Sequence, residues 1–265
     1  MDLSKICQNA VQLTERTARF IHQEAGRVSA GQIEEKERNS LVSYVDKEAE
    51  NQLVEGLAQL LPGSVFLTEE DTVENEEGEL RWIIDPLDGT TNFLYQIPAY
   101  SISIALEREG EIVLGIVYEI NRQECFYAWK GGGARLNGQN IRVSQRPTLE
   151  ESLLATGFPY YDYDHTQSYL QLLGELMQKT RGLRRLGSAA VDLAYVACGR
   201  FDGFFEYSLK PWDVAGGAFI VKEAGGHVVD FNGGDDWLHG GEMLASNRLI
   251  AEAFLLEVGA AFKRL

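Results

Sequence analysis

The chain is poor in cysteine. Its 265 residues include only Cys7, Cys125 and Cys198, which lie far apart and form no CxxC pair. Three widely spaced cysteines argue against a disulfide framework and a zinc site, and we expect a reducing, cytoplasmic environment. The four histidines are scattered, so they form no cluster of metal ligands. We interpret them as solvated or core residues rather than as a general base.

Basic residues are also scarce. The chain has 24 Lys and Arg against 40 Asp and Glu, which gives a formal net charge of −16. Nucleic acid binding needs a basic face, so this excess argues against a nucleic acid partner. It does not exclude a small phosphorylated substrate. A bound metal ion can neutralise local carboxylates and reverse the sign of the field in one cleft.

Long apolar runs are missing too. No run approaches the roughly 18–20 apolar residues that span a bilayer. Residues 1–8 are polar and unlike the apolar region of a signal peptide. We therefore expect no membrane partner. Hydrophobic residues still make up 45% of the chain, which is typical of a folded protein. The length suits one large domain or two lobes.

The first half of the chain mixes helical and strand patterns. Apolar spacing of three and four residues marks helices, and short β-rich runs between turn residues mark strands. Asp46 could cap the second helix, which Pro62-Gly63 ends. The predicted elements are helices over 6–20 and 46–60, a mobile loop over 33–39, strands over 65–67 and 81–84, a solvated acidic loop over 71–79 and an antiparallel meander over 101–128.

The pattern changes after about residue 147, where strands and helices alternate. The predicted strands are 152–156, 203–206, 227–230 and 243–245, and the predicted helices are 169–177, 189–198, 214–224 and 249–262. Such alternation is typical of an α/β unit. We therefore predict an α/β (α+β) protein with two lobes. Residues 1–148 form an α+β lobe that carries a metal-binding loop, and residues 149–265 form an α/β lobe that completes the active site.

Three groups of carboxylates stand out from the ordinary acidic surface. Glu69-Glu70 directly follow a predicted strand, and Asp213 follows Pro211-Trp212 at the start of an apolar helix. The third group, Asp85-Pro86-Leu87-Asp88-Gly89-Thr90-Thr91, ends a buried strand. Each group also has an ordinary interpretation: a solvated pair, a helix N-cap and a polar Asx-type turn, respectively.

The loop at residues 85–91 favours a metal site over a polar turn. Pro86 fixes φ and Gly89 permits a tight turn, so Asp85 and Asp88 can converge with a backbone carbonyl between them. Hard cations such as Mg²⁺ prefer carboxylate and carbonyl oxygens on a rigid loop. Carboxylates at the mouth of a core strand also need partners. The residues therefore predict a divalent metal site with hydroxyls and N–H groups that receive an anion.

These motifs resemble a known family. Residues 82–93 (WIIDPLDGTTNF) resemble the first signature of the inositol monophosphatase family, and residues 212–217 (WDVAGG), followed by 223–226 (EAGG), resemble the second. Glu69-Glu70 stand where the family has its glutamate pair. The resemblance implies a layered αβαβα sandwich of the sugar-phosphatase type, with the active site between two lobes. It also implies Mg²⁺-dependent, lithium-sensitive hydrolysis of a phosphate monoester, and a homodimer.

The resemblance also implies a set of metal ligands. Carried over by position, Glu69, Asp85 and the carbonyl of Leu87 hold the first metal ion. Asp85, Asp88 and Asp213 hold the second. Two or more Mg²⁺ ions are implied for each site, and Mn²⁺ is possible because it accepts the same oxygen ligands.

Catalytic and substrate-binding roles are implied in the same way. Glu69 and Thr90 activate a metal-bound water for in-line attack on phosphorus, and Asp88 belongs to the catalytic set. Glu206 stands where inositol-specific members bind a ring hydroxyl, and an exposed strand end is its ordinary interpretation. The implied substrate-binding residues are Asp88, Gly89, Thr90, Ser188, Ala189, Glu206 and Asp213.

The leading hypothesis is an inositol-1-phosphate phosphatase. The substrate could instead be 3′-phosphoadenosine 5′-phosphate, fructose 1,6-bisphosphate or histidinol phosphate, because family membership does not choose among them. Arg181, Arg184 and Arg185 could bind a second phosphate. A non-catalytic regulator that keeps the fold is the alternative class. Many members have Asp where this chain has Ser40, so loop closure and a third, weak metal stay open.

Overall fold

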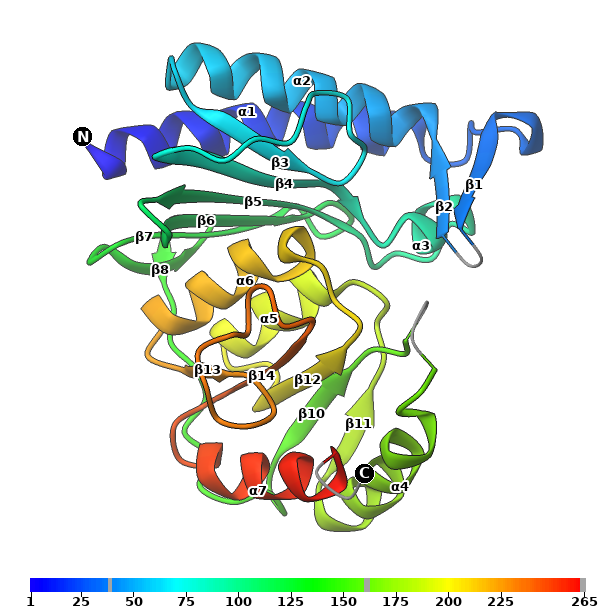
Figure 1. Ribbon diagram of the computed structural model, residues 1–265, viewed down its shortest axis with the longest axis vertical. Helices are drawn as coiled ribbons and strands as arrows, with labels where there is room; N and C mark the ends of the chain where they lie inside the picture. Colours follow the sequence, from blue (N-terminus) through cyan, green and yellow to red (C-terminus); the bar gives the residue numbers. More distant parts are fainter. Residues whose placement is uncertain (38–39, 160–162, 263–265) are drawn as a thin grey trace.

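The computed structural model describes residues 1–37, 40–159 and 163–262. They form five layers in the order αβαβα (Figure 1). This confirms the expected α/β class and the layered architecture. The helices are α1 (Leu3–Glu24), α2 (Tyr44–Leu60), α3 (Thr90–Leu94), α4 (Thr166–Lys179), α5 (Ala189–Ala197), α6 (Pro211–Glu223) and α7 (Ala251–Phe262), with a 3₁₀ turn at Ala30–Gln32. No helix of the described ranges is long and apolar enough to cross a membrane.

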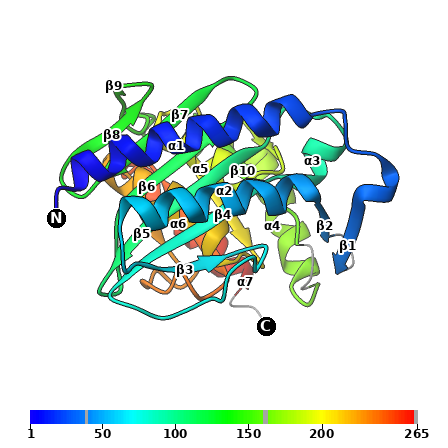
Figure 2. The ribbon, with the colours of Figure 1, turned by 90° about the horizontal axis from the view of Figure 1, so that it is seen from above.

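A seven-stranded sheet is covered on its outer face by α1 and α2, which lie side by side (Figure 2). Its strand order is β3-β4-β5-β6-β7-β8-β9. Only the pair β3 and β4 is parallel, and the remaining pairs form an antiparallel meander. The strands are β3 (Val65–Thr68), β4 (Leu80–Asp88), β5 (Ser101–Arg108), β6 (Glu111–Glu119), β7 (Glu124–Trp129), β8 (Gly133–Leu136) and β9 (Gln139–Asn140).

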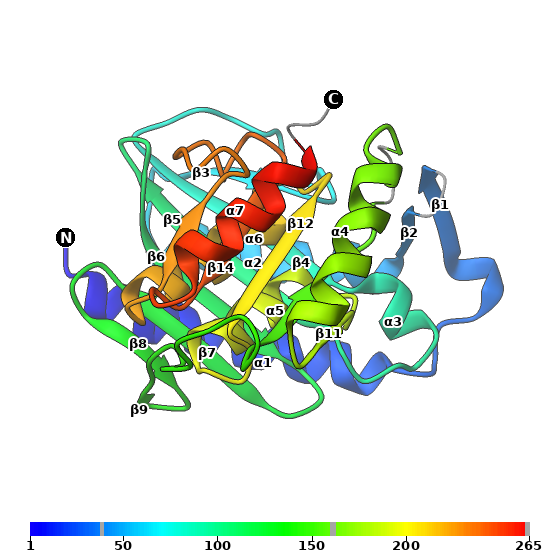
Figure 3. The same ribbon diagram turned by 90° about the horizontal axis from the view of Figure 1, so that it is seen from below.

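A five-stranded mixed sheet forms the second β layer, and α4 and α7 lie below it (Figure 3). Its order is β11-β10-β12-β14-β13, with β10 parallel to both neighbours and β14 antiparallel to both. The strands are β10 (Leu153–Thr156), β11 (Gly182–Arg184), β12 (Gly203–Tyr207), β13 (His227–Val229) and β14 (Glu242–Ser246).

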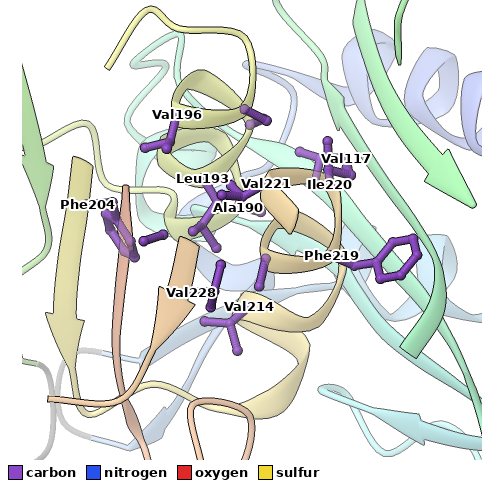
Figure 4. Close-up of a cluster of buried hydrophobic side chains, with 14 of the residues drawn as sticks. Val117, Ala190, Leu193, Val196, Phe204, Val214, Phe219, Ile220, Val221 and Val228 are labelled. Atoms are coloured by element: carbon purple, nitrogen blue, oxygen red, sulfur yellow. The ribbon is translucent and has the colours of Figure 1, made fainter. Parts of the chain in front are cut away.

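The central layer, α5 and α6, is buried between the two sheets. Val117 of β6 and Phe204 of β12 belong to the same apolar cluster as Leu193 and Ile220 of these helices (Figure 4). Both helices are apolar on most of their surface, as expected for helices covered on all sides. One continuous core therefore joins the two sheets and fixes the helix ends that lie between them.

The second helix begins earlier than predicted. Ser43, not Asp46, is the N-cap of α2: its hydroxyl accepts a hydrogen bond from the N–H of Val45, and Asp46 Oδ2 accepts one from the N–H of Ser43 at 2.9 Å. Asp46 is thus the acidic partner of a capping box. The prediction chose the wrong member because both residue types are good caps.

The predicted mobile loop over 33–39 is wrong in its described part. Strands β1 (Ile33–Glu37) and β2 (Ser40–Ser43) form an antiparallel hairpin, in which Ile33 pairs with Ser43. The charged sequence of β1 is typical of a solvated loop, which explains the prediction of a loop. Backbone hydrogen bonds to β2 form the strand in spite of that sequence. Residues 38–39, and the side chain of Ser40, lie outside the described structure.

Besides β1, β2 and the 3₁₀ turn, four short elements escaped the sequence pattern: α3, β8, β9 and β11. Elements this short carry too few residues for a period to show. The final helix also starts at Ala251 rather than Leu249, because Asn247 Oδ1 accepts hydrogen bonds from the N–H groups of Leu249 and Ile250. The other predicted elements are present, with ends shifted by a few residues.

Candidate active site

A cavity of about 400 Å³ brings the predicted site residues together. It is lined by residues from the ends of β4 and β12 and from the N-terminal ends of α5 and α6. These segments are far apart in sequence, and the five-layer fold gathers them. Every residue that the sequence predicted for the site lines this cavity: Glu69, Asp85, Leu87, Asp88, Gly89, Thr90, Ser188, Ala189, Glu206 and Asp213.

The end of β4 supplies the centre of the site. Asp85 is only 1% exposed, and its Oδ1 accepts a hydrogen bond from the N–H of Leu87 at 2.9 Å. Gly89 follows with a φ of +94°, and a Cβ there would lie 3.0 Å from the carbonyl oxygen of Ala99. Only glycine fits both the left-handed backbone and this close approach. The turn at Gly89 then starts α3 at Thr90.

Glu69 lies half-buried just after the end of β3. Hydrogen bonds to α2 hold the turn that follows it. The buried Glu50 of α2 accepts hydrogen bonds from the N–H of Glu70 at 2.8 Å and from the N–H of Thr72 at 2.9 Å. The side chain of Glu69 is hydrogen-bonded to Asp85. Two carboxyl groups that share a hydrogen bond must share a proton, unless a cation lies between them.

Asp88 is held by the start of α5. Its Oδ2 accepts hydrogen bonds from the Ser188 hydroxyl at 2.5 Å and from the N–H of Ala190 at 2.8 Å. Ser188 is the N-cap of α5, and its Oγ also accepts from the N–H of Val191 at 3.3 Å. The Ser188 hydroxyl therefore orients Asp88, in addition to lining the cavity.

Asp213 lies in the first turn of α6, three residues after the N-cap residue, Lys210. Its Oδ2 accepts a hydrogen bond from the N–H of Lys210 at 2.7 Å. Pro211 is the first helical residue, where its missing N–H costs nothing. The predicted placement of Asp213 at the helix N-terminus is confirmed, although Asp213 is not the N-cap itself.

Burial raises the pKa values of the site aspartates, and neighbouring carboxylates raise those of Asp85 and Asp213 further. Burial raises the pKa of Asp88 to about 6, and burial together with the charge of Asp88 raises that of Asp213 to about 7. The pKa of Asp85 lies well above its usual range, first because of burial and then because of Glu69, Asp88 and Asp213. Crowding of this kind opposes ionisation unless a cation balances the charge.

The donor set fits a hard divalent cation. The predicted ligands among the lining residues supply carboxylate and carbonyl oxygens, which Mg²⁺ prefers, and the crowded charge favours a divalent ion. Within the described part of the chain, no three His, Cys, Asp or Glu side chains stand close enough to enclose a metal as they are. Their oxygens are turned toward protein donors instead, as the bonds of Asp85, Asp88 and Asp213 show. Binding of a metal would exchange some of these bonds.

Sequence reasoning missed Asp46 as a member of the site. Asp46 is fully buried, and its Oδ1 accepts a hydrogen bond from the Thr90 hydroxyl at 2.9 Å. The same hydroxyl lies 3.0 Å from the carbonyl oxygen of Leu87. Burial raises the pKa of Asp46, although its hydrogen bonds oppose this shift. The sequence does single out Asp46, because it stands at the start of a predicted helix. Its predicted role as a helix cap explains that position without a role in the site.

The residues that line the cavity and that the sequence prediction did not include are, among others, Gly157 and Asp192, and Arg185 lines it too. Gly157 makes room for Glu206, because a Cβ at residue 157 would lie 1.9 Å from Glu206 Oε1. The guanidinium of Arg185 lies over the ring of Phe158 at 5.2 Å. Arg181 and Arg184 do not line the cavity, so the three arginines do not form one basic cluster there.

Known proteins resemble this chain over nearly its whole length. The model of the inositol monophosphatase family matches residues 2–261. An inositol-1-monophosphatase from Mesorhizobium japonicum is 42% identical over 259 residues, which cover 97% of each protein. The Nus factor SuhB of Escherichia coli is 39% identical over 260 residues, which cover 96% of this chain and 97% of that protein.

Solved structures agree with the sequence comparison. The extragenic suppressor protein SuhB from Bartonella henselae has a TM-score of 0.89 at 38% identity, and the match covers 98% of this chain and 99% of that one. An IMPase from Thermotoga maritima has a TM-score of 0.87 at 35% identity over 96% of each chain. The chain therefore belongs to the inositol monophosphatase family, whose members are generally metal-dependent phosphatases of small phosphorylated substrates.

Proposed function

We propose that this chain is a Mg²⁺-dependent phosphate monoester hydrolase whose substrate is a polyol monophosphate, inositol 1-phosphate. The observation that carries the proposal is the cavity itself. Buried carboxylates, the residue Thr90 and the buried Glu206 all line it. The 42% identity to an inositol-1-monophosphatase supports the same substrate.

Two Mg²⁺ ions would share the carboxylates. Glu69, Asp85 and the Leu87 carbonyl would hold one ion, and Asp85, Asp88 and Asp213 the other. A further weak ion, or Mn²⁺ in place of Mg²⁺, is compatible with oxygen ligands. When bound, such ions lower the pKa of a water and neutralise the charge on phosphate and leaving alkoxide.

The chain's own residues would orient the attacking water. Thr90 donates its hydroxyl proton to Asp46 or Leu87, so its oxygen keeps lone pairs that can accept a hydrogen bond from the water. Glu69 would take the proton that the water releases. The N–H groups of Gly89 and Thr90 would receive the phosphate oxygens, as turn N–H groups do. Asp88 keeps its orientation through its bonds to α5.

Glu206 would bind the alcohol part of the substrate. It lies in β12, is 8% exposed and lines the cavity. Burial and the charge of Asp213 raise its pKa well above the usual range. A buried carboxyl matched to a ring hydroxyl gives real discrimination, because an analogue without that hydroxyl leaves it unpaired. Ala189 would contact the same alcohol from the start of α5.

The proposal includes the organisation of the protein. Residues 1–148 and 149–265 would act as two lobes that meet at the cavity. We also propose a cytoplasmic homodimer that lithium inhibits, as the family resemblance implies. Light scattering on the purified protein tests the dimer, since a monomeric mass at micromolar concentration would contradict it. Phosphate release at increasing Li⁺ concentration tests the inhibition.

A second candidate function is binding of a partner without catalysis. The Nus factor SuhB of Escherichia coli is 39% identical to this chain, and its name describes a role other than hydrolysis. The net charge of −16 argues against direct contact with an RNA backbone. A partner would therefore be a protein surface. Every proposed metal ligand is present in this chain, which favours hydrolysis.

Phosphate release decides between the two functions. The protein is assayed with inositol 1-phosphate, 3′-phosphoadenosine 5′-phosphate, fructose 1,6-bisphosphate and histidinol phosphate, with Mg²⁺ and with a chelator. We expect Mg²⁺-dependent release, with the highest kcat/KM for inositol 1-phosphate. Release from none of the four substrates would reject the hydrolase proposal. A clear preference for another substrate would reject inositol 1-phosphate and keep the hydrolase.

A further inference from the structure

Asp192 is a buried carboxyl that the reaction described above does not use. It lies in the first turn of α5 and is only 1% exposed, yet it lines the same cavity as Glu206. Its Oδ1 has no hydrogen-bond partner in the described structure. Burying a carboxyl group without partners costs free energy, so such a residue needs an explanation.

The helix dipole does not explain Asp192. An acidic residue in a first turn is stabilising when it meets the free N–H groups there. In α5 those groups are already engaged, because the N–H of Ala190 donates to Asp88 and the N–H of Val191 donates to Ser188. The next residue, Leu193, packs into the apolar core (Figure 4). Asp192 therefore lies on the cavity side of α5, and the residues next to it are held by hydrogen bonds and by core packing.

A second buried carboxyl shows what a structural role looks like. Asp202 is fully buried and accepts hydrogen bonds from the N–H of Leu153 at 2.7 Å, from Arg146 Nη1 at 3.0 Å and from the hydroxyl of Ser144. These donors tie it to β10 and to the segment before that strand. No such donors reach Asp192 in the described structure. Because it lines the cavity, a bound ligand could supply the missing hydrogen-bond donor.

Glu206 and Asp192 face the cavity together. They interact electrostatically with each other and with Arg185. Among the described lining residues, only one guanidinium stands beside the two carboxyl groups, so this part of the cavity lacks the basic cluster that a second phosphate would need. Two carboxyl groups can instead accept hydrogen bonds from neutral donors of a ligand. The hydroxyls of a polyol ring are donors of this kind. Burial also raises the pKa of Asp192 well above its usual range.

We propose that Asp192 is a specificity-determining residue, which accepts a hydrogen bond from a ring hydroxyl next to the one that Glu206 binds. This role rests on the polyol phosphatase function proposed above. The two carboxyl groups together select a substrate with neighbouring hydroxyls. They reject apolar alcohols, which would leave both groups unpaired.

The test compares two substrates on the Mg²⁺-loaded protein. Inositol 1-phosphate carries the ring hydroxyls, and 4-nitrophenyl phosphate has none. We expect Asp192→Leu to lower kcat/KM for inositol 1-phosphate by about 10- to 100-fold, the range for an unmade hydrogen bond in a buried site. Turnover of 4-nitrophenyl phosphate changes by less than about threefold. Asp192→Asn keeps an oxygen acceptor and restores much of the loss.

Thermal unfolding separates this role from a structural one. Asp192→Leu removes an unpartnered buried carboxyl, so the metal-free variant keeps or raises its Tm. The matched control, Asp202→Asn, lowers the Tm and leaves the ratio of the kcat/KM values for the two substrates unchanged. An equal loss on both substrates for Asp192→Leu, or no loss on inositol 1-phosphate, overturns the proposal. A wild-type protein that hydrolyses neither substrate overturns the proposed function instead, and the role of Asp192 with it.

Discussion

The hydroxyl of Thr90 lies 2.9 Å from Asp46 Oδ1, and this hydrogen bond joins α2 to the start of α3. Asp46 Oδ2 is occupied by the N–H and the hydroxyl of Ser43, at 2.9 and 2.7 Å. One buried carboxylate therefore links the capping box of α2 to the proposed water-positioning hydroxyl.

The first prediction concerns this hydroxyl. Thr90→Val should lower kcat about 100-fold, within the range for loss of a proton-transfer or orienting group, while KM changes little. Thr90→Ser keeps the hydroxyl and serves as the control, with most of the activity retained. Asp46→Asn should have a smaller effect of about tenfold, because Thr90 can still bond Leu87. Equal activities of the Val and Ser variants would contradict the role of the hydroxyl.

Asp88→Asn should nearly abolish turnover and keep the fold. The amide is neutral and coordinates Mg²⁺ weakly, so we expect kcat to fall by at least about 100-fold. Its oxygen can still accept from Ser188 and Ala190, so the start of α5 stays in place. Phosphate release measures the loss of turnover, and circular dichroism checks that the fold is kept. Activity near that of the wild type would show that the metal assignment is wrong.

The metal-free protein should lose stability as the pH rises from about 4 to 7. The pKa of Asp88 is raised from 3.8 to about 6 and that of Asp213 to about 7. In this window the folded protein holds protons that the unfolded chain has released, so the free energy of unfolding falls as the pH increases. Thermal unfolding in chelator at a series of pH values measures this slope, and Asp213→Asn should flatten it.

Mg²⁺ should reverse this trend. Metal binding needs ionised carboxylates, so the increase in Tm on adding Mg²⁺ should be larger at pH 8 than at pH 5. The same unfolding experiment with and without Mg²⁺ provides the comparison. If Mg²⁺ raises the Tm equally at both pH values, the raised pKa values of Asp88 and Asp213 do not belong to the metal ligands.

Gly157→Ala should disturb Glu206 and thereby the choice of substrate. The new Cβ would lie 1.9 Å from Glu206 Oε1, so the carboxyl group has to move. We expect kcat/KM for inositol 1-phosphate to fall about tenfold, with 4-nitrophenyl phosphate little affected. Gly174→Ala is the control, because Gly174 lies in α4 with nothing within 4 Å of a Cβ. A parallel loss on both substrates would speak against a role of Glu206 in selection.

Gly115→Ala should destabilise the whole fold. A Cβ at residue 115 would lie 2.5 Å from the carbonyl oxygen of Gly216, where α6 rests on the seven-stranded sheet. The helix would have to move away, at a cost of about 1–3 kcal/mol. Denaturant unfolding of this variant and of Gly174→Ala measures the difference. Unchanged stability of Gly115→Ala would show that the contact between helix and sheet is loose.

Much of the site was visible in the sequence because its residues are local to strand and helix ends. Asp85 and Asp88 stand three residues apart at the end of β4, so Pro86 and Gly89 already predicted that they converge. Asp213 was placed correctly because Pro211 marks the start of a helix. Asp46 and Asp192 were missed, since each stands within a helix where an acidic residue has an ordinary explanation.

Sequence by itself determined the types of the longer elements and the family, and the family resemblance implied the metal-ligand residues. These follow from local patterns and from motifs within a few residues of each other. Tertiary structure decided which distant groups meet: Thr90 with Asp46, Asp88 with Ser188, and Gly157 with Glu206. The physical reason is that such contacts arise from packing two sheets on shared helices, which no local pattern encodes. The cavity, and Asp192 at its wall, exist only in that packing.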